Sequence, residues 1–169
     1  SSAEGFGLSH MEAMMSGTPT IATVIGGLQD QMGFKIDGNE ITVNDFTADK
    51  PSNSTGLLSK DHGEWTYPLW PQLNCQGSPP TPYIYDSRAN INDITKGLEH
   101  WYNMSIEDRR SKGMAGREWA IKNGFTKKGM CDVMIDSIET CFKNFKPRKA
   151  YTLINTTIEP KVYSTGVIL

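Results

Sequence analysis

The chain has little of what membrane-spanning, nucleic-acid-binding and disulfide-stabilised proteins need. Its 169 residues contain no run of about 18 apolar residues, so we expect no transmembrane segment. A basic segment followed by an apolar stretch is also missing from its start, and no secretion signal is expected. The formal net charge is only −2, which argues against a surface for nucleic acids or anionic membranes, because such surfaces need concentrated positive charge.

Cysteine is scarce as well. Cys75, Cys131 and Cys141 are an odd number of residues, and they contain no C-x-x-C pair. This pattern predicts a reducing, cytoplasmic setting and argues against a structural zinc site. Hydrophobic residues make up 37% of the chain, which is enough for the packed core of one domain.

The first part of the chain predicts an α/β fold. Residues 8–16 place apolar side chains at helical spacing, and Gly17 and Pro19 would end that helix. Residues 19–23 form a short uncharged run, which is typical of a strand buried on both faces. A helix followed by such a strand is the repeating unit of α/β sheets.

The middle of the chain is less regular. Short strands are predicted at 41–43, 55–59 and 83–87. Residues 61–83 are rich in proline and tryptophan, and they predict a long irregular insertion.

Three helices are predicted after residue 90. The first begins at a cap formed by Asn90 or Asn92 and buries a single face: Ile91, Ile94, Leu98, Trp101 and Tyr102. The second runs from Ser105 to about Lys122 with Met114 and Trp119 inward, and the third spans about 126–145. The third is expected to bury Met130, Val133, Met134, Ile138 and Cys141. Residues 1–145 are then one domain, and 146–169 are an extended or disordered tail.

The segment AEGFGL, residues 3–8, carries the strongest functional signal. A Gly-Phe-Gly turn before a helix leaves backbone N–H groups free to bind a phosphate, although a tight turn that simply needs glycine is the structural alternative. Glu4 stands at the entrance of this turn, and Glu12 lies eight residues later on the predicted helix. Because carboxylates accept hydrogen bonds from sugar hydroxyls, two acids on either side of a phosphate seat fit a nucleotide-sugar.

This segment resembles the Glu-x7-Glu motif of retaining GT-B glycosyltransferases, the large group that includes sucrose synthase. The pattern E-G-F-G-L-x-x-x-E-A-M-A-x-G-x-P-V-I-A-[ST]-x-x-G-G is matched at Glu4, Gly5, Phe6, Gly7, Leu8, Glu12, Ala13, Met14, Gly17, Pro19, Ile21, Ala22, Gly26 and Gly27. The resemblance extends over roughly residues 1–60 and 90–145, with 61–83 as an insertion.

The resemblance implies a role for each matching residue. Glu4 would be the catalytic-site acid that binds the donor sugar, and the backbone N–H groups of Gly7 and Leu8 would hold the diphosphate. Gly5 and Phe6 would be further donor-binding residues. Glu12 would bind the ribose. Thr23 and the Gly26–Gly27 turn would shape the wall of the donor pocket.

The resemblance also implies a fold and an activity. The chain would be part of the Rossmann-like C-terminal domain of such an enzyme, followed by C-terminal helices, with an N-terminal acceptor domain missing. It would transfer a hexosyl group from a nucleotide-sugar to an unidentified carbohydrate, lipid or protein acceptor, with retention of configuration and without a metal or other cofactor. Two alternatives stay open, a non-catalytic nucleotide-sugar-binding module left from a truncated transferase and another doubly wound nucleotide-binding protein.

Two further features allow more than one interpretation. His10 lies between the two glutamates, where it is either a catalytic base or, as is commoner on a polar helix face, a surface residue. A group of aromatic residues could stack on sugar rings or could pin a long loop to the core: Trp65, Tyr67, Trp70, Tyr83 and Tyr85.

Overall fold

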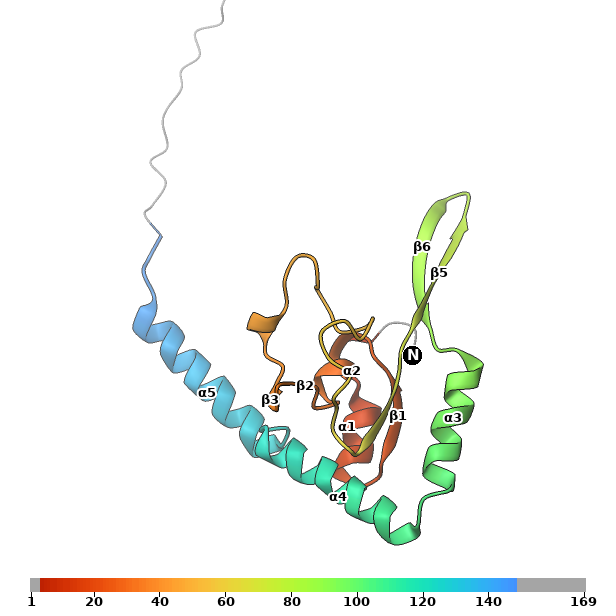
Figure 1. Ribbon diagram of the computed structural model, residues 1–169. Helices are drawn as coiled ribbons and strands as arrows, with labels where there is room; N and C mark the ends of the chain where they lie inside the picture. The colour runs from red at the N-terminus through yellow and green to blue at the C-terminus, as the bar shows by residue number, and fades with distance from the viewer. Residues whose placement is uncertain (1–3, 149–169) are drawn as a thin grey trace, which may run out of the picture. The chain divides into compact units, whose positions relative to one another are not determined.

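The computed structural model describes residues 4–148 (Figure 1). Its elements, in chain order, are α1 (Leu8–Met15), β1 (Thr20–Thr23), α2 (Gly26–Asp30), β2 (Lys35–Ile36), β3 (Asn39–Glu40), the 3-10 helix η1 (Val43–Asp45), β4 (Thr66–Leu69), β5 (Gln72–Ser78), β6 (Thr81–Arg88), α3 (Ile91–Tyr102), α4 (Ile106–Lys122) and α5 (Lys127–Asn144). This mixture of helices with a small parallel sheet confirms the predicted α/β class and is consistent with part of a Rossmann-like domain. The chain divides into two units, residues 1–132 and residues 133–169.

The parallel sheet pairs β1 with β4, strands that are far apart in the sequence. Thr20 lies opposite Thr66, and Thr23 lies opposite Leu69 at the carboxyl ends. Two antiparallel ribbons, β2 with β3 and β5 with β6, complete the strands of the described residues. The predicted strand at 19–23 is therefore confirmed.

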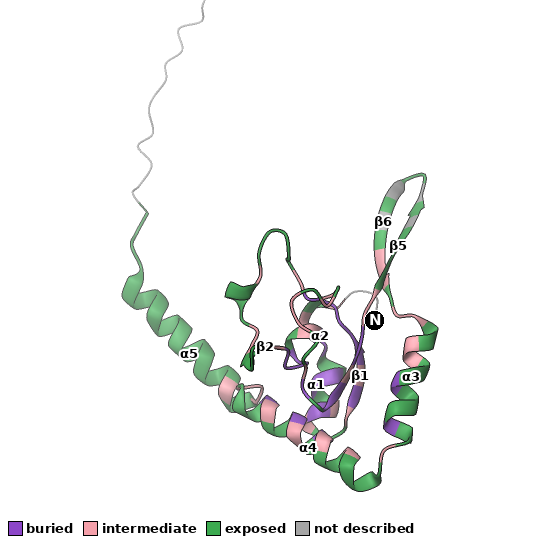
Figure 2. Cartoon of the chain, in the orientation of Figure 1, coloured by how far each residue is buried: buried purple, intermediate pink, exposed green. Residues whose placement is uncertain are grey.

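Two clusters of buried side chains form the core of the first unit. Figure 2 shows buried residues on α1 and along β1. One follows β1 into the segment after α2 and consists of Ala22, Val24, Ile25, Leu28, Met32 and Phe34. The other joins α1 to α4 around an indole ring and consists of Met11, Met14, Trp65 and Ala120. Both β1, through Ala22, and α1, through Met11 and Met14, thus contribute to the core.

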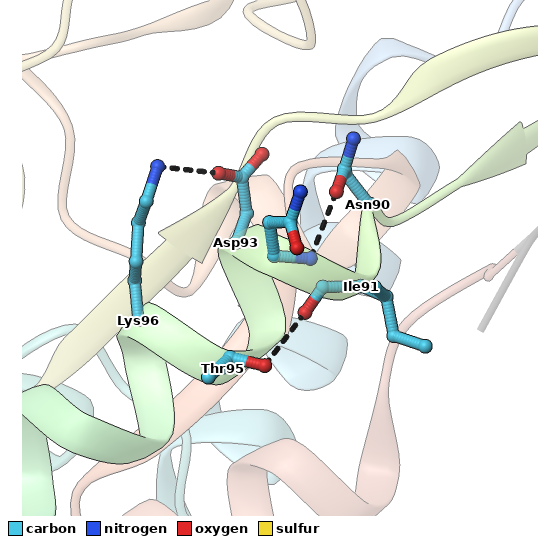
Figure 3. A network of polar contacts seen from close by, with 6 residues as sticks. Asn90, Ile91, Asp93, Thr95 and Lys96 are labelled. Atoms are coloured by element: carbon cyan, nitrogen blue, oxygen red, sulfur yellow. Dashed lines mark hydrogen bonds and ion pairs between the residues drawn. The ribbon is translucent and has the colours of Figure 1, made fainter.

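Helices α3 and α4 begin at the predicted caps. The Asn90 side chain accepts a hydrogen bond from the Asn92 amide at 2.8 Å, and Lys96 pairs with Asp93 one turn along α3 (Figure 3). Ser105 accepts from the Asp108 amide at 3.0 Å at the start of α4. These bonds satisfy amides that the first turn of a helix leaves without partners.

The predicted strands at 41–43 and 55–59 are wrong, because side chains bind the backbone there. Thr42 and Asp45 form a reciprocal cap around η1, in which the Thr42 amide donates to the Asp45 carboxylate at 2.7 Å. The buried Asn53 amide oxygen accepts from the amides of Leu58 and Ser59. Both segments are held as turns rather than as strands.

The predicted irregular insertion at 61–83 is also wrong, since it contains β4, β5 and the start of β6. The prolines misled the prediction because several lie at positions that pairing tolerates. Pro71 separates β4 from β5, and Pro79 and Pro80 lie between β5 and β6. Pro68 lies within β4 opposite Ala22, as proline can in an edge strand. The predicted strand at 83–87 is confirmed as part of β6.

The predicted apolar faces of α3 and α4 are only partly correct. Trp101 is buried on α3, but Ile91, Leu98 and Tyr102 are exposed. The buried face of α4 is made of small residues, Gly113, Gly116 and Ala120, whereas Met114 is 46% exposed. The small residues face inward because α4 approaches the turn after α1 closely: a Cβ built at Gly113 would lie 2.0 Å from the Gly17 carbonyl oxygen.

Helix α5 confirms the predicted third helix but not its burial. None of its described residues, Lys127–Asn144, is buried. Exposed apolar side chains include those expected inside: Met130, Val133, Met134 and Ile138, with Cys141 also exposed. Of the predicted tail at 146–169, all but residues 146–148 lie outside the described residues. Within the described part of the chain, no helix combines the length and apolarity that crossing a bilayer requires.

Candidate functional site

The turn of residues 4–7 leads directly into an uncapped helix. Gly7 is the N-cap of α1 with φ 88°, a conformation that glycine adopts readily, and no side chain caps the helix among the described residues. Leu8 and Ser9, the first residues of the helix, are exposed. An exposed helix N-terminus without a capping side chain can bind an anion through its amides and its dipole.

The Gly26–Gly27 pair contacts the backbone of this turn. The Gly27 amide donates to the Gly5 carbonyl at 2.9 Å. A Cβ at Gly26 would lie 1.9 Å from the Glu4 carbonyl oxygen, and one at Gly27 would lie 2.3 Å from the Gly5 carbonyl oxygen. The two glycines therefore allow the start of α2 to contact the turn, and any side chain there would displace the turn.

A cavity of about 720 Å³ opens beside the turn. Of the predicted site residues, Glu4, Gly7 and Thr23 line it, and Glu4 is half-buried. Gly5, Phe6 and Leu8 are exposed next to it, whereas Glu12 is exposed on α1 and is not among the lining residues. The structure thus brings Glu4 to the cavity and leaves Glu12 on the outer surface of the helix.

Other lining residues come from segments that the motif does not include. They are Ser9, His10, Ala13, Thr20, Ile21, Ala22, Leu28, Leu69, Ala89, Ile94 and Leu98. Thr23 and Leu69 end the two parallel strands, which is where open α/β sheets bind ligands, so strand pairing could have indicated Leu69. The contribution of α3 through Ile94 and Leu98 depends on tertiary packing and has no local signal.

His10 is buried, so the interpretation as a surface residue is wrong. Its Nδ1 lies 2.9 Å from Gln31 Oε1, and its Nε2 lies 2.8 Å from Thr20 Oγ1. Burial lowers the pKa of His10, and the hydrogen bond to Gln31 opposes this effect in part. Because both ring nitrogens are bonded to protein groups, the geometry favours a structural function over that of a catalytic base.

The aromatic residues divide between the core and the surface. Trp65 is buried and donates its Nε1–H to the Gln31 carbonyl at 3.1 Å, and Trp70 packs against the first core cluster. These two pin the segment to the core, as one of the two interpretations predicts. Tyr83 and Tyr85 are exposed on β6. No group of His, Cys, Asp and Glu suited to a metal ion occurs within residues 4–148.

Comparison with known proteins gives one match, to the first part of the chain. Residues 1–48 match the family model described as glycosyl transferases group 1, which supports the prediction of a glycosyltransferase and a general role in glycosyl transfer. The match covers 48 of the 169 residues and includes the turn, α1, β1 and the Gly26–Gly27 pair. No curated protein and no solved structure showed a significant similarity to the chain.

Proposed function

We propose that the chain carries the donor site of a retaining glycosyltransferase that uses a nucleoside-diphosphate sugar. The observation that carries this proposal is the uncapped α1 N-terminus beside the half-buried Glu4, inside the segment that matches the group 1 family. The amides of a helix N-terminus can bind a diphosphate. A carboxylate beside them can accept hydrogen bonds from the hydroxyls of the attached sugar.

The donor extends along the turn in three parts. The sugar occupies the cavity, where Glu4 accepts hydrogen bonds from its hydroxyls. The diphosphate lies against the amides of Gly7 and Leu8, with Gly5 and Phe6 forming the rest of the cradle. The ribose lies over the exposed face of α1 and binds Glu12, about one turn from the helix start.

During this reaction, negative charge that develops on the leaving diphosphate must be stabilised. The bond between the anomeric carbon and the diphosphate oxygen breaks, and a bond to an acceptor hydroxyl oxygen forms on the same face of the sugar. The products are the glycosylated acceptor, the nucleoside diphosphate and the proton of the acceptor hydroxyl. The helix N-terminus stabilises the charge that develops on the leaving diphosphate, so no metal is required.

Isothermal titration with UDP, GDP, ADP and their glucose and mannose derivatives tests this proposal. We expect one nucleotide series to bind, and the nucleotide-sugar to bind at the same site as its nucleoside diphosphate, so that each competes with the other. Absence of binding to all of them would contradict the assignment. Binding without any transfer to a panel of carbohydrate, lipid and protein acceptors would contradict the catalytic part of it.

A further inference from the structure

Gln31 connects the turn of residues 4–7 to the interior of the protein. It follows α2 directly and is fully buried. Its side-chain Nε2 donates a hydrogen bond to the Phe6 carbonyl, and its Oε1 faces His10 Nδ1. The Phe6 carbonyl belongs to the turn that carries Glu4, so one buried amide holds this turn and α1 together.

The direction of these bonds fixes the state of His10. Because the Gln31 nitrogen points to a carbonyl, its oxygen must accept, and His10 Nδ1 must therefore carry the hydrogen. His10 Nε2 then accepts from the hydroxyl of Thr20, which is anchored in β1 and lies 3.2 Å from Thr66 Oγ1 in β4. The chain of bonds runs from the parallel sheet through α1 to the turn.

The turn has few other attachments of this kind. Besides the bond from Gln31, the turn accepts a hydrogen bond from the Gly27 amide, which donates to the Gly5 carbonyl. Phe6 itself is exposed, and its ring lies 6.0 Å from that of Phe125 between centroids. Gly7 is buried against Leu28 at the other end of the turn. The Gln31 side chain therefore shares the fixing of the turn with the Gly27 amide and with this packing, and it is the one side-chain amide that bonds to the turn among the described residues.

We propose that Gln31, oriented by His10, is a positioning residue of the donor site. It holds the Phe6 carbonyl so that the turn presents Glu4 to the cavity. This inference rests on the proposed function. It distinguishes the two acids, because Glu4 lies on the turn that Gln31 holds, whereas Glu12 lies within α1 and does not depend on that bond.

The substitution Gln31→Met, made in the full chain, tests this inference because it keeps the length of the side chain and removes both hydrogen bonds. We expect affinity for the nucleotide-sugar to fall roughly fivefold or more relative to affinity for the nucleoside diphosphate. Hydrogen exchange measured by mass spectrometry on the peptide that covers residues 4–9 should become faster. The probes are the glucose and mannose derivatives of UDP, GDP and ADP and the three free diphosphates.

Variants of His10 provide a graded check. His10→Asn places an amide nitrogen near the position of Nδ1 and should retain most of the preference for the sugar, whereas His10→Leu should lose it. The matched control is Asn53→Leu, which removes another buried amide, one that bonds to Leu58 and Ser59 and not to the turn. This control should lower thermal stability without changing the ratio of the two affinities.

The outcomes separate the two proposals. Absence of binding by the unmodified protein would overturn the proposed function, and hydrogen exchange would still decide the role of Gln31. Unchanged exchange of residues 4–9 in Gln31→Met would overturn the positioning role. An unchanged ratio of affinities, or an equal change in Asn53→Leu, would also overturn it.

Discussion

Helices α4 and α5 follow one another in the chain, yet only α4 buries residues. Helix α5 carries several large apolar side chains, but none of its described residues is buried, whereas α4 buries Gly113, Gly116 and Ala120. The close approach of α4 to the turn after α1 explains the difference. Arg117 of α4 donates to the Met15 carbonyl at 2.9 Å, and the glycines let the backbones meet. Apolar spacing alone therefore does not decide which face of a helix is buried.

The largest expected effect on the free energy of unfolding comes from comparing two methionines, one buried and one exposed. Met14 is fully buried between α1 and α4, and Met134 is exposed on α5. Met14→Ala should lower the free energy of unfolding by about 2–5 kcal/mol because it leaves a cavity. Met134→Ala should change it by less than about 0.5 kcal/mol. Urea denaturation measures both, and equal losses would contradict the burial described here.

The second effect tests the close contact of α4. A Cβ at Gly116 would lie 2.6 Å from the Trp65 Cβ, so Gly116→Ala should cost about 1–3 kcal/mol. In an uncrowded helix the same replacement would instead add up to about 1 kcal/mol. Ser137→Ala on the exposed face of α5 serves as the control and should be neutral or slightly stabilising. A gain in stability for Gly116→Ala would show that α4 does not approach Trp65 closely.

The smallest expected effect is a dependence on pH. Because burial lowers the pKa of His10 below 6.5, the unfolded chain binds a proton that the folded chain does not. The free energy of unfolding should therefore fall as the pH decreases below about 6.5. Glu4, which lines the same cavity as His10, is the charged group that shares this environment. His10→Asn should show a flatter profile in this acidic range, and parallel profiles would contradict the burial of a neutral His10.

The sequence predicted those features that local chemistry determines. The helix caps at Asn90 and Ser105, the end of α1 before Gly17 and the strand at 20–23 follow from short patterns of neighbouring residues. The turn of residues 4–7 was predicted for the same reason, because two glycines and a following helix already define it. The spacing of Thr42 and Asp45 is that of a capping pair and could have predicted the short helix. The strand predicted at 41–43 did not take this spacing into account.

Features that depend on distant contacts could not be predicted. The pairing of β1 with β4 joins residues far apart in the sequence, such as Thr20 and Thr66. The prolines in and after β4 also made this strand hard to recognise. His10 looked like a surface residue because its partners, Thr20 and Gln31, lie in other elements. The side chains of α3 that line the cavity, Ile94 and Leu98, were assigned to a buried face for the same reason.

The most direct measurement compares the two glutamates of the donor site by isothermal titration, with the exposed Glu118→Ala as control. Glu12→Ala should weaken binding of both the nucleoside diphosphate and its sugar derivative by about 1–3 kcal/mol, because the ribose is common to both. Glu4→Gln should weaken binding of the sugar derivative alone. If both variants bind both ligands as the unmodified protein does, these carboxylates do not hold a nucleotide-sugar, and the account is wrong.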